Sequence, residues 1–191
     1  MRPIGFALLL AAAALTGCSG GTAADPAPSP PAATQAATQT AAAASATAVA
    51  ATPGCEFYQA ADARAVLGGE LKGPAKFTDN EPGKTDTRFN SCVYWSADDQ
   101  RYANVGYRKA LTAAGATDNR KQFTSQRTGD AAAVAGVGGD AYWDTPNGQV
   151  LVLVGDDLLV ISTGVKDAPK EGRSRTDTEK LAKLVVSHLP A

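Results

Sequence analysis

The stretch that decides the fold is Gln149–Thr163, with the sequence QVLVLVGDDLLVIST. Two runs rich in Val, Leu and Ile, Gln149–Val154 and Leu158–Thr163, flank the short polar link Gly155-Asp156-Asp157, which is typical of a tight β-hairpin turn. The apolar residues are continuous instead of alternating with polar ones, so both faces of these strands are expected to be at least partly covered. The stretch therefore predicts a hairpin at the centre of a sheet.

Three more strands are predicted upstream of this hairpin. Phe89–Trp95 and Tyr102–Lys109 are rich in β-formers and are joined by the polar turn Ser96–Gln100. The short run Ala141–Asp144 follows a glycine-rich segment and precedes the central hairpin. Together with the hairpin they make an antiparallel β-sheet of about five strands.

Helices are predicted on both sides of these strands. Gln59–Leu67 is a short helix that Gly68-Gly69 ends, and a weaker helical stretch covers about 116–126. The last helix is predicted to begin at a capping box, Thr176-x-x-Glu179, and to end at Pro190. Its inner face is expected to carry Leu181, Leu184, Val185 and His188. Residues 72–87 are rich in Gly, Pro, Asn, Asp and Lys and predict a long exposed loop.

The fold class is therefore α+β, with two to three helices packed on the sheet. Val93-Tyr94-Trp95-Ser96 and Ala141-Tyr142-Trp143-Asp144 each precede a polar turn and an apolar strand. This echo raises the hypothesis of an internal duplication.

The N-terminus is predicted to carry an export signal. Arg2 is followed by the apolar run Ile4–Leu15, which is too short to cross a bilayer stably, and then by Leu15-Thr16-Gly17-Cys18. This arrangement resembles the bacterial lipoprotein signal, in which the cysteine thiol is acylated before cleavage. The resemblance implies that residues 1–17 are removed, and that Cys18 anchors the protein to the outer face of the cytoplasmic membrane, in the cell envelope.

Residues 18–53 are expected to form a disordered tether. Almost every residue after Cys18 is Ala, Thr, Pro, Ser, Gly or Gln, so the segment cannot bury enough apolar surface to offset its ordering entropy. Residues 54–191 have the size of a single globular extracytoplasmic domain. Only Arg2 and Asp25 of the 18 basic and 19 acidic residues precede this domain, so it is nearly neutral and nucleic acid is not an expected partner.

The two remaining cysteines, Cys55 and Cys92, are expected to form a disulfide because an exported chain reaches a non-reducing space. Two free thiols or half of a metal site are the alternatives. A metal site needs more ligands, yet His188 is the only histidine and no CxxC or HxxxH spacing occurs. No metal and no cofactor are therefore predicted.

These features together resemble the small uncharacterised lipoproteins common in actinobacteria. The resemblance rests on the acylated cysteine, the Ala/Pro/Thr tether, Cys55 before a short helix, Cys92 in Cys-Val-Tyr-Trp, and Gly136-Val-Gly-Gly-Asp-Ala-Tyr-Trp before a hairpin. It implies an α+β domain outside the membrane. It transfers no catalytic residue to this chain.

Several residues are candidates for chemical sites. Gly136-x-Gly138-x-x-Ala141 fits the dinucleotide fingerprint only superficially, because a strand and not a helix is predicted after it. Asp98-Asp99 and Asp156-Asp157 are candidate acid–base pairs, and ordinary turn residues are the favoured interpretation. His188 with Ser162 is a candidate base and nucleophile, and a histidine that packs or stabilises the helix end is favoured.

The aromatic residues Trp95, Trp143, Tyr94 and Tyr142 are a candidate platform for a sugar or lipid ligand, although core packing is favoured because large aromatics usually bury. The sequence thus predicts a tethered module that binds an envelope ligand or another exported protein. A cell-envelope hydrolase with an unrecognised active site is the alternative, and no catalytic residue is predicted.

Overall fold

The computed structural model describes residues 49–190. The predicted signal sequence, the lipidated Cys18 and nearly all of the predicted tether lie outside these residues. In the described part, no helix is long and apolar enough to cross a membrane.

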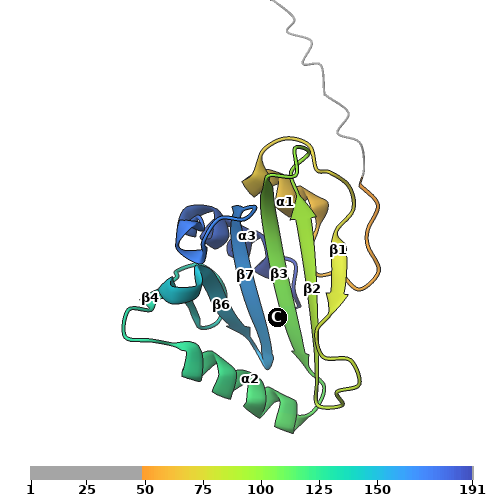
Figure 1. Cartoon of the computed structure of the whole chain (residues 1–191). Helices are drawn as coiled ribbons and strands as arrows, with labels where there is room; N and C mark the ends of the chain where they lie inside the picture. Colours follow the sequence, from red (N-terminus) through yellow and green to blue (C-terminus); the bar gives the residue numbers. More distant parts are fainter. Residues whose placement is uncertain (1–48, 191) are drawn as a thin grey trace, which may run out of the picture. The chain divides into compact units, whose positions relative to one another are not determined.

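Seven strands form one antiparallel sheet, in the order β1-β2-β3-β7-β6-β5-β4 (Figure 1). Their bounds are Lys76–Asp79 (β1), Thr87–Trp95 (β2), Arg101–Ala110 (β3), Ala132–Ala133 (β4), Ala141–Asp144 (β5), Gln149–Val154 (β6) and Asp157–Val165 (β7). The α+β class is confirmed, but the number of strands is a correction. The two additional strands are β1, inside the predicted loop, and the two-residue β4, and both lie at sheet edges.

The central hairpin is confirmed. β7 is the middle strand of the sheet and pairs with β6 on one side and β3 on the other. Val150 lies opposite Ile161, and both side chains are fully buried. Gly155 has a φ of +59° in the turn, a conformation that glycine adopts without steric cost.

Three α-helices accompany the sheet: α1 (Ala60–Leu67), α2 (Ala113–Gln126) and α3 (Arg175–Val186). Two short 3₁₀ turns, η1 (Thr145–Asn147) and η2 (Lys170–Gly172), flank the upper end of β6 and β7. The predicted capping box of the last helix is wrong by two residues. Ser174 is the N-cap, and its hydroxyl accepts a hydrogen bond from the Asp177 amide.

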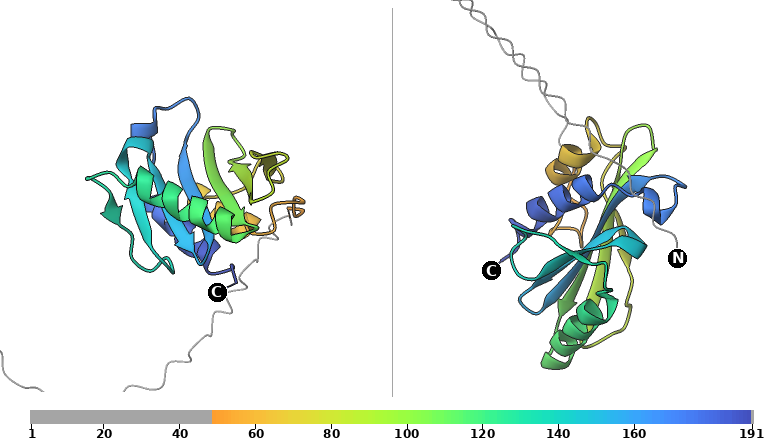
Figure 2. Two further views of the ribbon diagram at one scale, coloured as in Figure 1. Left: turned by 90° about the horizontal axis from the view of Figure 1, so that it is seen from below. Right: turned by 90° about the vertical axis from the view of Figure 1, so that its left-hand side faces the viewer.

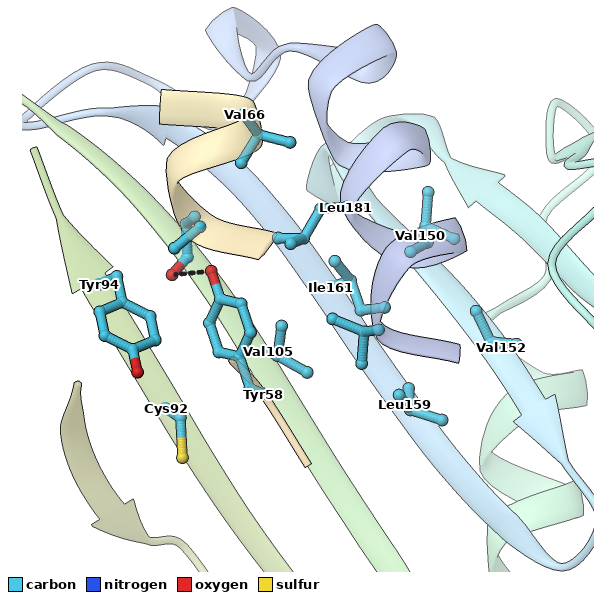
Figure 3. Close-up of a cluster of buried hydrophobic side chains, with 14 of the residues drawn as sticks. Tyr58, Val66, Cys92, Tyr94, Val105, Val150, Val152, Leu159, Ile161 and Leu181 are labelled. Carbon is cyan, nitrogen blue, oxygen red and sulfur yellow. Dashed lines mark hydrogen bonds between the residues drawn. The ribbon is translucent and has the colours of Figure 1, made fainter. Parts of the chain in front are cut away.

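The helices divide between the two faces of the sheet (Figures 1 and 2). α1 and α3 pack on what we call the first face, and Figure 3 shows its core, which includes Val105, Ile161 and Leu181. α2 packs on the second face through Phe123, which contacts a separate cluster of Tyr142, Leu151 and Leu158.

The inner face of α3 differs from the prediction at Ala182, Leu184 and His188. Leu181 and Val185 are fully buried as expected, and so is Ala182. Leu184 is only half-buried, and His188 lies beyond the helix end. The helix is rotated so that the small Ala182, which lets α3 approach the sheet closely, takes the inner position.

Cys55 and Cys92 form the expected disulfide. It joins the segment before α1 to the buried side of β2, beside Tyr58, whose hydroxyl donates to the Ala103 carbonyl oxygen at 3.3 Å (Figure 3).

The order of the elements has an internal two-fold pattern. β1-β2-β3 and β4-β5-β6 lie in mirrored order on the two sides of β7, and each triplet follows a helix. The helix that precedes each triplet covers a different face of the sheet. Tyr94 and Tyr142 likewise lie on different faces: Tyr94 packs on Tyr58, and Tyr142 packs on Phe123. Two α-β-β-β units rotated about an axis along β7 would give this pattern. The duplication itself stays a prediction.

Candidate functional site

A hollow of about 340 Å³ opens on the first face, at the end of β2 and β3 away from their connecting turn. We call it the basic pocket. It is lined by Gly54, Glu56, Phe57, Arg88, Asn90, Tyr107 and Lys109. Three of these come from the segment before α1, two from β2 and two from β3.

Two cations stand side by side in this pocket. Arg88 of β2 is the direct cross-strand partner of Lys109 of β3, and both residues are exposed. Directly opposed residues have Cβ atoms about 4.5–5.5 Å apart, and like charges at such positions destabilise the strand pair. Neither cation forms an ion pair within residues 49–190. The site therefore holds two positive charges, neither of which forms an ion pair with a described side chain.

Two half-buried aromatic rings give the pocket an apolar wall. Phe57 and Tyr107 have ring centroids 5.1 Å apart and planes tilted by 48°. The Tyr107 hydroxyl donates to Asp157 Oδ2, and burial together with this carboxylate holds the Tyr107 pKa far above its ordinary value. Tyr107 therefore stays neutral, and its hydroxyl is already used.

Glu56 and Asn90 add an acceptor each. The Glu56 carboxylate accepts a hydrogen bond from the Gly54 amide at 2.9 Å, and this bond lowers the Glu56 pKa below its ordinary value. The Asn90 Oδ1 atom is buried and has no hydrogen-bond partner in the described structure. A buried acceptor left without a donor costs free energy. A ligand or a water molecule that donates a hydrogen bond to Asn90 would remove this cost.

The disulfide and a glycine fix the wall of the pocket. The Cys55–Cys92 bond ties the Gly54–Phe57 segment to β2 next to the pocket. Gly54 has a φ of +86°, and a Cβ atom there would lie 2.6 Å from the Phe77 ring. Only glycine therefore allows the chain to pass Phe77 and present Glu56 and Phe57.

A second hollow, of about 390 Å³, lies at the turn end of β2 and β3, beside the C-terminal end of α1. Two of its polar side chains, Arg101 and Ser96, are satisfied within the fold. Arg101 donates to the carbonyl oxygens of Val66 and Leu67 and pairs with Asp177, and Ser96 donates to Asp98. These contacts hold α1, α3 and the turn together. This hollow therefore offers a ligand fewer polar groups without partners than the basic pocket does.

The four aromatic residues predicted as a platform do not form one surface. Tyr94, Trp143 and Tyr142 are buried in the two cores. Only Trp95 is half-exposed, on the second face, where its ring centroid lies 5.6 Å from that of Tyr102.

Asp98, Asp99 and Asp156 lie in hairpin turns, as the favoured interpretation expected, and Asp157 is the first residue of β7. Asp98 accepts from Ser96 and from the Gln100 amide, and Asp99 pairs with Lys72 and Lys166. Asp156 pairs with Arg120. Asp157 accepts from Tyr107 and from the Ala110 amide at 2.8 Å.

His188 does not reach Ser162. Its Nε2 atom lies 3.1 Å from the buried Asp62 carboxylate, linking the end of α3 to the start of α1. Ser162 is buried in β7 and shares the second face with its strand neighbours Leu158 and Val160. The predicted base and candidate nucleophile are therefore on opposite sides of the sheet.

Gly136 and Gly138 have positive φ angles and precede strand β5, so their motif forms a turn and not a nucleotide-binding loop. Among residues 49–190, no group of three or more His, Cys, Asp or Glu side chains is arranged to hold a metal ion.

The sequence analysis did not predict the basic pocket, because its candidate sites were aromatic, acidic and histidine motifs and the cations Arg88 and Lys109 belong to none of them. A partial signal was present: Arg88 precedes the predicted turn Ser96–Gln100 by eight residues and Lys109 follows it by nine, so both lie at the far end of the predicted hairpin. The register was needed to use it. Shifting the pairing by one residue would place Arg108 opposite Arg88 and turn one of the strands over.

Comparisons of the chain with family models, with curated proteins and with solved structures found no match.

Proposed function

We propose that this protein is a lipid-anchored binding module of the cell envelope, and that it binds an anionic ligand in the basic pocket. The observation that carries the proposal is the directly opposed, unpaired Arg88 and Lys109. Their repulsion costs stability, and an anion held between them would turn the repulsion into two charge-assisted contacts.

The apolar wall supports binding of an organic anion over a simple inorganic one. Phe57 and Tyr107 present ring surface beside the two cations, and small-molecule sites typically combine such apolar walls with a few placed polar groups. A free chloride or phosphate would leave the surface of these rings exposed to water.

Anchoring through Cys18 is part of the proposal. A tether of about 35 residues has a root-mean-square reach of roughly 30–35 Å, which would hold the domain clear of the lipid headgroups while confining it to the membrane. Replacing Cys18 with Ser should release the protein to the soluble fraction and abolish incorporation of labelled palmitate. Unchanged membrane association and labelling would contradict the anchor without touching the pocket.

The binding proposal is tested with benzoate and its neutral analogue benzamide. Calorimetric titration of the full-length chain in nonionic detergent should show benzoate binding. The affinity for benzamide should be lower by about tenfold or more, because charge-assisted hydrogen bonds are lost.

Arg88→Gln and Lys109→Gln should each weaken benzoate binding. Lys121→Gln is the matched control, because Lys121 is an exposed lysine of α2, an element that does not line the pocket. Equal affinity of benzoate for Lys109→Gln and Lys121→Gln would contradict an anion site at this place.

A further inference from the structure

The charges in the basic pocket restrict the ligand to a monoanion. Two cations and one carboxylate line it, Arg88, Lys109 and Glu56, and the Asp157 carboxylate accepts the Tyr107 hydroxyl beside them, so the site carries a net charge of at most +1. Glu56 has a lowered pKa and is therefore ionised at neutral pH. A phosphate monoester carries a charge of about −1.5 to −2 at pH 7, so its second charge would meet Glu56 without a cation of its own. A carboxylate matches the charge of the site.

The Arg88 guanidinium also favours a carboxylate geometrically. Its planar fork of N–H donors matches the two oxygens of a carboxylate, while Lys109 contributes a mobile point charge beside it. The two side chains approach the same position from neighbouring strands.

Asn90 offers an unused acceptor to a hydrogen-bond donor on the ligand. It lies two residues beyond Arg88 on the same face of β2, and its cross-strand partner is Tyr107. Asn90, whose Oδ1 atom has no partner, therefore lines the pocket next to both Arg88 and Tyr107. A ligand that enters with its carboxylate on the cations would place the group next to the carboxylate near Asn90.

The aromatic wall and the volume describe the rest of the ligand. Phe57 and Tyr107 offer tilted ring faces to an apolar side chain. A volume of about 340 Å³ is near the lower limit of ligand pockets, which span roughly 300–1,000 Å³, so one residue-sized unit fills it.

We infer that the basic pocket binds the free carboxyl-terminal residue of a peptide with an apolar or aromatic side chain. The carboxylate lies on Arg88 and Lys109, the amide N–H of the same residue donates to Asn90, and the side chain packs on Phe57 and Tyr107. This inference rests on the proposed function, since it specifies which anion occupies the same site.

The test uses four small probes on the full-length chain in nonionic detergent. N-acetyl-phenylalanine carries the carboxylate, the N–H and the ring. N-acetyl-phenylalaninamide lacks the charge, 3-phenylpropanoate lacks the N–H, and phenyl phosphate replaces the carboxylate with a doubly charged group. Titration calorimetry gives the dissociation constant of each.

N-acetyl-phenylalanine is expected to bind most tightly. Its amide should bind about tenfold to a hundredfold more weakly because a charge-assisted contact is lost, and 3-phenylpropanoate about threefold to tenfold more weakly because a neutral hydrogen bond is lost. Lys109→Gln should weaken N-acetyl-phenylalanine about tenfold, while the control Lys121→Gln leaves it unchanged.

Asn90→Ala tests the donor contact separately. It should weaken the binding of N-acetyl-phenylalanine about threefold to tenfold and leave the binding of 3-phenylpropanoate unchanged. Only N-acetyl-phenylalanine has an N–H group, and this group loses its acceptor in the variant. A variant that merely loosened the pocket would weaken both ligands alike, and that result would overturn the assigned contact.

The remaining outcomes separate the two proposals. Binding of phenyl phosphate that depends on Lys109, without binding of N-acetyl-phenylalanine, would overturn the peptide inference and leave the anion site standing. Equal binding of N-acetyl-phenylalanine and its amide would also overturn it. Absence of binding by every anionic probe would overturn both.

Discussion

Arg108 and Lys109 are neighbours in β3, yet their side chains lie on opposite faces of the sheet in opposite electrostatic situations. Arg108 is 6% exposed on the second face, and its guanidinium contacts the Glu81 carboxylate at 3.0–3.2 Å and Asn119 Oδ1 at 2.7 Å. Lys109 is exposed on the first face, opposite another cation, with no ion pair in the described structure.

The difference shows which charges the fold requires. A buried cation without partners costs several kcal/mol, so Arg108 needs Glu81 and Asn119 for the protein to fold. An exposed cation needs no partner, and the repulsion between Arg88 and Lys109 only reduces stability. The paired face therefore serves the structure, and the unpaired face is available to a ligand.

The largest effect is expected from Arg108→Leu. It leaves the half-enclosed Glu81 charge with only the exposed Lys84, at 3.7 Å, and the Thr87 hydroxyl as partners. Breaking a buried pair in this way destabilises by about 3–5 kcal/mol. Urea unfolding should show a lower midpoint with an unchanged slope. A loss below about 1 kcal/mol would mean that this network is as dispensable as the cations of the basic pocket.

Glu81→Gln should cost less, about 2 kcal/mol at pH 7, because the amide keeps an acceptor for Arg108 but loses the charge. Burial raises the Glu81 pKa, but hydrogen bonds from Arg108 and Thr87 outweigh it, so the pKa lies below its ordinary value of 4.5. The stabilisation is therefore present above about pH 4.5 and lost as the pH falls through the folded-state pKa.

The difference in unfolding free energy between the wild type and Glu81→Gln should accordingly shrink as the pH is lowered below about 4.5. Urea unfolding across this range measures it. A difference that stayed constant down to pH 2 would show that ionised Glu81 does not stabilise the fold.

Asn119→Ala should destabilise by about 1–2 kcal/mol. Its side-chain amide donates to the carbonyl oxygens of Arg108 and Asp156, and its Oδ1 accepts from Arg108, so the change leaves polar groups of the second face without partners. Thermal unfolding measures the loss, with Lys121→Ala, a change at an exposed residue of the same helix, as control.

The smallest effect, and of opposite sign, is expected from the basic pocket. Arg88→Gln or Lys109→Gln should stabilise by about 0.2–1 kcal/mol, because it removes a like-charge pair. The gain should be largest at low salt, near 0.01 M, where the Debye length is about 30 Å, and vanish near 1 M. Destabilisation by either change would reveal a structural partner and weaken the case for a ligand site.

Local sequence patterns predicted much of this fold for physical reasons. The continuous apolar runs of β6 and β7 require cover on both faces, which fixes them at the sheet centre. Two cysteines in a domain predicted to be exported predict their own pairing. Gly68-Gly69 ends α1 wherever that helix packs, because the chain leaves it with positive φ at both residues.

Other features depended on partners distant in the sequence. β1 has four exposed residues and exists because it pairs along β2, which no pattern within it reveals. The rotation of α3, with Ala182 inside and Leu184 half-exposed, follows from how closely the helix approaches the sheet. The aromatic residues of the predicted platform were divided between faces by the alternation of each strand.

The sequence by itself determined the α+β class, the central hairpin and the Cys55–Cys92 bond, because each depends on composition or on contacts within short segments. Only the tertiary structure decided the candidate site. The pairing register placed Arg88 opposite Lys109, and the disulfide brought Glu56 and Phe57 beside them. Charges from three separate segments make a pocket only once the chain has folded, since their proximity depends on register and not on spacing along the sequence.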